Sequence, residues 1–314
     1  MASRRWVVVL AAGSGTRVRD MTLDASGATI PKQYWSGRNG VPMLRLALRR
    51  ARMLTTATRV VAVVAAEHRA YWEPHLRSFP SSNVVVQPFD RGTAVGVLLP
   101  LLRVLRRDPH STVALLPADH AVENEDVVLE RLQTAFTLAQ GGRQALLLGA
   151  TPDSADPEYG WVECGPVAVD GTRPILAFEE KPGFSRARRL QRRGAYWSTF
   201  MLVASGRALL AMYERAAPQL FRALAPVSQQ PGERLTSIYA KLPVADFSRD
   251  VLEPVAPWVR LLPMPRCGWT DLGTPARLAR WMEQGKPERS TRRQLPTRRE
   301  PATRREPELS ETPA

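Results

Sequence analysis

The sequence predicts an α/β protein with a doubly wound, mostly parallel, Rossmann-like sheet. Short apolar runs rich in valine and leucine alternate with longer helical stretches along the first half of the chain. Apolar runs without polar interruption are typical of strands buried on both faces of a parallel sheet. Their alternation with helices is typical of the doubly wound architecture. The length of 314 residues, with 44% hydrophobic and 24% charged residues, suits a large globular domain.

The predicted elements follow one another from the N-terminus, and each strand leads through a loop into a helical stretch. Ligands bind beyond the carboxyl ends of the strands in such sheets, so functional residues are expected in the loops that follow strands. The expected strands are Trp6–Ala12, Val60–Ala66, Val84–Gln87, Thr112–Leu116 and Ala145–Gly149, and the expected helices are Met43–Leu54, Thr93–Arg107 and Asp126–Ala139.

The chain is strongly basic, with a net charge of +14. Only four of its 44 basic residues are lysines, namely Lys32, Lys181, Lys241 and Lys286. No nucleic-acid-binding motif accompanies the charge, so a solvated arginine-rich surface is favoured over specific nucleic-acid binding. In such a chain a lysine marks a position where a compact ammonium suits better than a planar guanidinium.

No apolar run approaches the roughly 18–20 residues of a membrane span, so no membrane association is expected. The basic start before residues 6–12 resembles a short export signal, but a buried first strand explains this brief apolar run better. Cys164 and Cys267 are too few and too far apart for a disulfide framework or a thiolate zinc site. We therefore expect a cytoplasmic protein, and the sequence leaves its oligomeric state open.

The composition changes near residue 285, where proline, arginine and glutamate become dominant. Residues 297–301 nearly repeat as residues 303–307, and almost nothing in this stretch could be buried. Two regions are therefore expected: a catalytic domain over residues 1–284 and a disordered tail over residues 285–314. An inert solvated tail is favoured over one that binds a polyanion.

A glycine-rich turn follows the first strand as Leu10-Ala11-Ala12-Gly13-Ser14-Gly15-Thr16-Arg17. Glycines at this place let backbone amides approach a phosphate closely. The turn lacks the lysine of a Walker loop and the third glycine of a Rossmann loop. By itself it is equally typical of a plain tight turn.

The segment Pro31-Lys32-Gln33-Tyr34 makes the pattern more specific. Together with the glycine-rich turn, it resembles the opening of the sugar-1-phosphate nucleotidylyltransferases, and most closely their mannose-1-phosphate guanylyltransferase branch. The resemblance extends over roughly residues 6–280. It implies the nucleotide-diphospho-sugar transferase type of fold, a nucleoside triphosphate and a sugar 1-phosphate as substrates, and Mg²⁺ as cofactor.

Further segments resemble this family in the same order along the chain. Residues 87–94 resemble its base-proximal segment, and Leu116-Pro117-Ala118-Asp119-His120 resembles its first metal-binding motif. Residues 159–162 and 178–182 resemble its sugar-binding segments, and residues 269–274 resemble the motif of its second metal-binding aspartate. Helix caps explain Thr93, Asp119 and Asp271 equally well without the family, and a surface ion pair is the alternative for Lys181.

The resemblance implies a role for each matching residue. Catalytic roles fall to Arg17 and Lys32; nucleotide contacts to Leu10, Ala12, Gly13, Ser14, Gly15, Thr16, Gln87, Arg91, Gly92 and Thr93; sugar-phosphate contacts to Tyr159, Gly160, Glu180, Lys181 and Ser198; and metal ligation to Asp119 and Asp271.

Two departures from the family pattern bear on specificity. Ser198 stands where an asparagine is expected to bind the sugar, and residues 244–247 match their motif only loosely. We expect transfer of GMP from GTP to mannose 1-phosphate, giving GDP-mannose and pyrophosphate. The alternatives are another substrate pair, such as UTP or dTTP with glucose 1-phosphate, and a non-catalytic sensor of nucleotide sugars.

Overall fold

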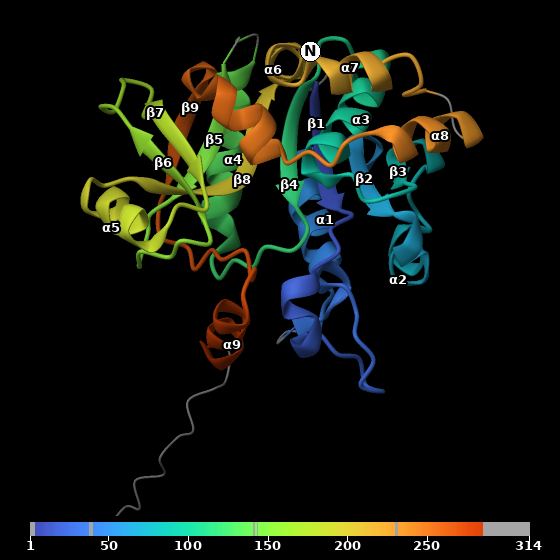
Figure 1. Ribbon diagram of the computed structural model, residues 1–314, viewed down its shortest axis with the longest axis horizontal. Helices are drawn as coiled ribbons and strands as arrows, with labels where there is room; N and C mark the ends of the chain where they lie inside the picture. Colours follow the sequence, from blue (N-terminus) through green and yellow to red (C-terminus); the bar gives the residue numbers. More distant parts are fainter. Residues whose placement is uncertain (1–3, 38–39, 141, 143, 230–231, 285–314) are drawn as a thin grey trace, which may run out of the picture.

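The computed structural model describes residues 4–37, 40–140, 142, 144–229 and 232–284. Within these residues a single nine-stranded sheet runs through the molecule in the order β3-β2-β1-β4-β8-β5-β9-β7-β6. Figure 1 shows the N-terminal strands and the β6–β7 hairpin at opposite ends of the sheet. The strands are β1 (Arg5–Ala11), β2 (Val60–Ala65), β3 (Val84–Gln87), β4 (Thr112–Pro117), β5 (Ala145–Ala150), β6 (Gly160–Cys164), β7 (Arg173–Glu180), β8 (Tyr196–Ser205) and β9 (Val259–Met264).

The N-terminal half of the sheet is parallel, as predicted. Strand β1 pairs in parallel with β2 on one side and with β4 on the other, and β2 pairs in parallel with β3. The five predicted strands all form, with ends that differ from the prediction by one residue at most. The carboxyl ends of β1 and β4 therefore open onto the same edge, which is where the predicted phosphate turn and Asp119 lie.

The C-terminal half makes the sheet mixed. Strand β8 is antiparallel to both β4 and β5, while β5 and β9 are parallel. Strands β6 and β7 form an antiparallel hairpin that also pairs with β8 and β9. Thus β8 joins the parallel half to the half that carries the predicted sugar segments.

Helices cover both faces of the sheet and give it two apolar cores. Alternate residues of β1 show the division, since Val8 belongs to one core and Val7 and Val9 belong to the other. The helices are α1 (Met43–Leu54), α2 (Arg69–Leu76), α3 (Gly92–Arg107), α4 (Glu125–Ala139), α5 (Phe184–Arg192), α6 (Gly206–Ala216), α7 (Pro218–Leu224), α8 (Glu233–Lys241) and α9 (Pro275–Gln284).

Helix α9 lies apart from both main cores, below the sheet in Figure 1. Leu278 and Trp281 of α9 pack with Val18 and Met43 of the N-terminal region in a small third cluster. The predicted tail lies outside the described residues. None of the described helices is long and apolar enough to cross a bilayer.

Candidate active site

Two adjoining pockets lie beyond the carboxyl ends of β1 and β4. The first, here called the central pocket, has a volume of about 300 Å³ and reaches from the glycine-rich turn to β6, β7 and β8. The second, here called the strand-end pocket, has a volume of about 360 Å³ and reaches from the same turn to the start of α3. The residues common to both linings are Ser14, Gly15, Asp119, His120 and Phe200.

The structure gathers all the predicted site residues except Arg91 into the linings of these pockets. In addition to the shared residues, the predicted residues that line the central pocket are Thr16, Arg17, Lys32, Tyr159, Gly160, Glu180, Lys181, Ser198 and Asp271. Those that line the strand-end pocket are Leu10, Ala12, Gly13, Gln87, Gly92 and Thr93. Segments that are remote in sequence therefore converge at one edge of the sheet. The role of each residue stays a prediction.

The glycine-rich turn is held in shape by the segment that follows it. The buried Gln33 amide donates to the carbonyls of Ala11 at 3.1 Å and Gly13 at 2.8 Å, and the Tyr34 hydroxyl donates to Ala11 at 2.8 Å. Gly15 adopts a φ of 60°, and a Cβ there would lie 3.2 Å from the backbone nitrogen of Lys32. Only glycine combines this backbone conformation with so close an approach without strain.

Lys32 brings a buried positive charge to the two acidic loops. Lys32 is 5% exposed. Its Nζ lies 2.8 Å from Asp119 Oδ2 and 2.5 Å from the carbonyl oxygen of Asp271. Burial alone would raise the pKa of Asp119, but the charge of Lys32 and its hydrogen bond lower that pKa below its usual range. The Asp119 carboxylate is therefore ionised and paired.

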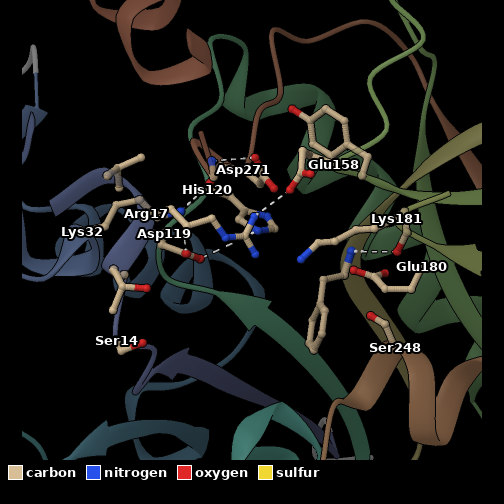
Figure 2. A pocket seen from close by; sticks show the side chains of 18 of the residues that line it. Ser14, Arg17, Lys32, Asp119, His120, Glu158, Glu180, Lys181, Ser248 and Asp271 are labelled. Carbon is tan, nitrogen blue, oxygen red and sulfur yellow. Dashed lines mark hydrogen bonds and ion pairs between the residues drawn. The ribbon is translucent and has the colours of Figure 1, made fainter. Parts of the chain in front are cut away.

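A short bridge fixes the distance between the two acidic loops. Ala121 and Thr270 exchange backbone hydrogen bonds of 2.9 and 3.0 Å just beyond Asp119 and just before Asp271. Figure 2 shows Lys32, Asp119 and Asp271 together at one side of the central pocket, opposite Glu180 and Lys181.

These two carboxylates fit a metal that arrives with a nucleotide. Among the described residues, no group of three or more histidine, cysteine or acidic side chains is arranged to hold a metal ion. Mg²⁺ is commonly bound through one or two carboxylates together with substrate phosphates. Asp119 and Asp271 supply such a pair, and the phosphate oxygens would complete the donor set.

His120 is a neutral side chain beside the first carboxylate. Burial lowers its pKa to about 4, although the nearby Asp119 and Asp271 oppose that shift. Its Nδ1 accepts a hydrogen bond of 3.3 Å from Trp269 Nε1, so Nε2 carries the proton and lies 3.8 Å from Asp119 Oδ1. His120 therefore borders both pockets as a hydrogen-bond donor rather than as a cation.

The opposite wall is built from β6, β7 and β8. Glu180 at the end of β7 faces Gly160 of β6, where a Cβ would lie 2.7 Å from Glu180 Oε2, and the Cβ of Ser198 is also close. Burial, followed by the charge of Asp246, raises the pKa of Glu180 to about 7, although Lys181 opposes this rise. Glu180 therefore changes its protonation near neutral pH rather than near pH 4.5.

Backbone strain is concentrated at the site. The non-glycine residues with a positive φ among the described residues are Lys181 at 52°, Phe200 at 60° and Leu272 at 49°. Lys181 and Phe200 line the central pocket, and Leu272 follows Asp271 directly. Such conformations cost of order 1–3 kcal/mol each and cluster at functional sites, where surrounding contacts hold them.

Arg17 forms an ion pair with Glu158, and both residues line the central pocket. Its Nη1 lies 3.0 Å from Glu158 Oε2, and both side chains are about half exposed. Figure 2 shows this pair bridging from the glycine-rich side to the segment before β6. Because both partners are exposed, the ion pair contributes little to stability and can open readily.

The start of α3 forms the floor of the strand-end pocket. Gly92 has a φ of 81°, and a Cβ there would overlap the carbonyl of Ala245. Thr93 donates to Asp246 Oδ2 at 3.1 Å. Arg91 instead donates to the carbonyls of Tyr239 and Ala240, so the structure uses it to anchor the end of α8 outside both linings.

Several lining residues were not among the predicted site residues. Glu158, Phe200, Ser248 and Trp269 all line the central pocket. Trp269 belongs to the same motif as Asp271, and this closeness in sequence could have indicated that Trp269 lines the site. Glu158 and Phe200 owe their position to the pairing of β6, β7 and β8, and Ser248 lies in the helical segment Phe247–Leu252.

The fold defines the class of protein, which is the nucleotide-diphospho-sugar transferase type. The structure resembles one from Thermus thermophilus described as a mannose-1-phosphate geranyltransferase, with a TM-score of 0.76, 26% identity, and coverage of 86% of this chain and 76% of that one. A putative glucose-1-phosphate thymidylyltransferase from Bacillus anthracis shares the fold, with a TM-score of 0.57, 16% identity, and coverage of 90% and 95%.

The chain belongs to the nucleotidyl transferase family, which matches residues 6–286. It is 26% identical over 288 residues to the mannose-1-phosphate guanylyltransferase of Escherichia coli K12, covering 87% of this chain. The chain spans 58% of the length of that relative. The predicted fold class and the expected family are thus both confirmed.

Proposed function

We propose that the protein transfers a nucleotidyl group from a nucleoside triphosphate to a sugar 1-phosphate, with GTP and mannose 1-phosphate as the substrate pair. The observation that carries this proposal is the composition of the central pocket. A glycine-rich turn, a buried lysine and two acidic loops form one wall, and a glutamate and a second lysine form the other. The similarity to mannose-1-phosphate guanylyltransferases supports the choice of substrates.

The reaction requires a phosphate oxygen of the sugar phosphate to attack the α-phosphorus of the triphosphate. The new P–O bond forms as the bond to the bridging oxygen breaks, and pyrophosphate leaves with its electron pair. Such a displacement depends on positioning and charge neutralisation more than on proton transfer. It therefore suits a pocket rich in fixed charges.

On the nucleotide side, the amides of residues 13–16 would cradle the triphosphate, and Arg17 would neutralise the leaving pyrophosphate. Lys32 would move from Asp119 to the α-phosphate, where its compact charge stabilises the transition state. Mg²⁺ held by Asp119 and Asp271 would supply further charge neutralisation at the phosphates. The strand-end pocket, which reaches Gln87 and the start of α3, would take the base.

On the sugar side, Glu180 would accept hydrogen bonds from sugar hydroxyls, and Lys181 would bind the sugar phosphate. Gly160 leaves room for the sugar ring beside Glu180. A residue with a Cβ at this position would crowd the Glu180 carboxylate. Ser198 is shorter than an asparagine, and this difference bears on which sugar is accepted.

The test is a grid of GTP, ATP, UTP, CTP and dTTP against the 1-phosphates of mannose, glucose, galactose and N-acetylglucosamine, with Mg²⁺. Pyrophosphate release is the readout, and chromatography identifies the nucleotide sugar. An Asp119→Asn preparation, purified in parallel, controls for contaminating enzymes. GDP-mannose formation supports the proposal. Activity with UTP or dTTP and glucose 1-phosphate would retain the reaction and correct the substrates. No turnover, with GDP-mannose still raising the melting temperature, would favour a non-catalytic sensor.

A further inference from the structure

Arg277 makes an unusual set of contacts around the second acidic loop. It lies in the first turn of α9 with a side chain 7% exposed, and its Nη1 is 2.9 Å from Asp271 Oδ1. Its guanidinium carbon lies 4.0 Å from the centre of the Tyr159 ring, and Nε is 3.7 Å from Asp156 Oδ2. Burial opposes its charge, but Asp271 raises the pKa of Arg277 above its usual value, so the guanidinium is charged.

The contacts of Asp271 are unevenly divided between its two oxygens. Oδ1 accepts a hydrogen bond of 2.8 Å from the Gly273 amide and also faces Arg277. Oδ2 accepts no hydrogen bond from any residue that the structure describes, and the nearest approach of Arg277 is to Oδ1. The carboxylate is thus anchored by one oxygen, and the strained φ of Leu272 shows that the loop is held in this geometry by its surroundings.

The same guanidinium reaches the sugar side of the site. Tyr159 lies between Arg277 and Trp197, with its ring centre 4.3 Å from that of Trp197, and its hydroxyl is 3.3 Å from Thr270 Oγ1. Tyr159 also precedes Gly160, which lines the central pocket. Arg277 therefore contacts both the Asp271 loop and the start of β6.

We propose that Arg277 is a positioning residue that anchors Asp271 through Oδ1 and so presents Oδ2 to a metal-bound nucleotide. This inference rests on the proposed function. A purely structural role fits less well, because neither Nη1 nor Nη2 of the buried guanidinium has a hydrogen-bond partner among the described residues, and Nη1 approaches Asp271 Oδ1 as an ion pair only. Burying a charged group whose donors are incompletely satisfied opposes stability.

A double-mutant cycle tests the inference with the full chain. Arg277→Ala, Asp271→Asn and the double variant are compared with wild type, and Arg280→Ala on the exposed side of α9 is the matched control. The readouts are kcat and KM for the nucleotide, and Mn²⁺ binding in the presence of GTP without sugar phosphate, measured by electron paramagnetic resonance. Arg277→Lys shows whether charge suffices without the planar guanidinium.

We expect Arg277→Ala to lower kcat at least tenfold and to weaken Mn²⁺ binding in the presence of GTP, with no further loss when Asp271 is already asparagine. Arg280→Ala should behave as wild type. Losses that simply multiply across the cycle, or unchanged Mn²⁺ binding in Arg277→Ala, would overturn the inference. Arg277→Lys should recover part of the lost Mn²⁺ binding; a lysine variant no better than alanine would also count against it.

The two proposals fail in distinguishable ways. If the wild-type chain turns over substrate and Arg277→Ala binds Mn²⁺ as well as wild type does, the positioning role alone is refuted. A wild-type chain that binds Mn²⁺ and GTP without turnover refutes the proposed function, and the cycle is then read from Mn²⁺ binding. A wild-type chain that binds no Mn²⁺ in the presence of GTP refutes both.

Discussion

Glu180→Gln should change how the stability of the protein depends on pH. The folded protein raises the pKa of this carboxyl from 4.5 to about 7, chiefly through burial. The favourable contribution of the protonated Glu180 carboxyl to the free energy of unfolding is therefore fully present below pH 4.5 and is lost as the pH rises through 7. A shift of this size corresponds to about 3 kcal/mol in total, of which about 2 kcal/mol falls between pH 5 and pH 8.

The glutamine variant keeps the shape of the side chain but does not ionise. Relative to wild type, its free energy of unfolding should therefore improve by about 2 kcal/mol between pH 5 and pH 8. Urea unfolding followed by circular dichroism at pH 5, 6, 7 and 8 measures this difference. Glu179→Gln is the control, because its side chain forms a partly exposed ion pair with Arg186. A difference between wild type and Glu180→Gln that stays constant with pH would refute the reasoning.

Four further variants probe the site and its supports. Asp119→Asn should lower kcat at least 100-fold with an unchanged circular dichroism spectrum; near wild-type turnover would contradict its metal role. Lys181→Ala should raise the KM for the sugar phosphate more than that for the nucleotide, and the opposite ranking in steady-state kinetics would remove it from the sugar site. Glu158→Gln releases Arg17, so the KM for the nucleotide should fall about two- to fivefold, the range of an exposed ion pair; a rise would show that Glu158 helps binding. Gly92→Ala should lower the free energy of unfolding by about 1–3 kcal/mol, because a Cβ there overlaps a backbone carbonyl; an unchanged denaturant midpoint would contradict this.

The parallel half of the fold was predictable because its signals are local. Strand β3 and helix α1 have the predicted ends, because proline or polar residues flank both: Asn83 and Pro88 flank the strand, and Pro42 and Thr55 flank the helix. Strands β6 to β9 were not predicted. Their exposure alternates irregularly, as in β7, and their place in the sheet depends on pairing with distant strands as well as on the β6–β7 hairpin.

The site, like the fold, has a part that local sequence motifs predict and a part that only the tertiary structure shows. Lys32, Asp119 and Glu180 were predicted from motifs, because each belongs to a short segment that resembles the family. The pairing of Lys32 with Asp119 on one wall of the pocket is a tertiary contact that no motif states. Arg277 carries no signal in an arginine-rich chain, and its importance follows only from the docking of α9 beside Asp271.

The central position of β8 has a consequence for how the chain is made. Strand β4 is completed by residue 117, but its antiparallel partner spans residues 196–205. At roughly 5–20 residues per second, several seconds of synthesis separate the two. During that interval β4, whose residues are all buried in the finished protein, presents an open apolar edge. Open edges of this kind readily pair with other chains. A nascent or truncated chain that ends before Tyr196 is therefore expected to aggregate through this edge unless a chaperone covers it.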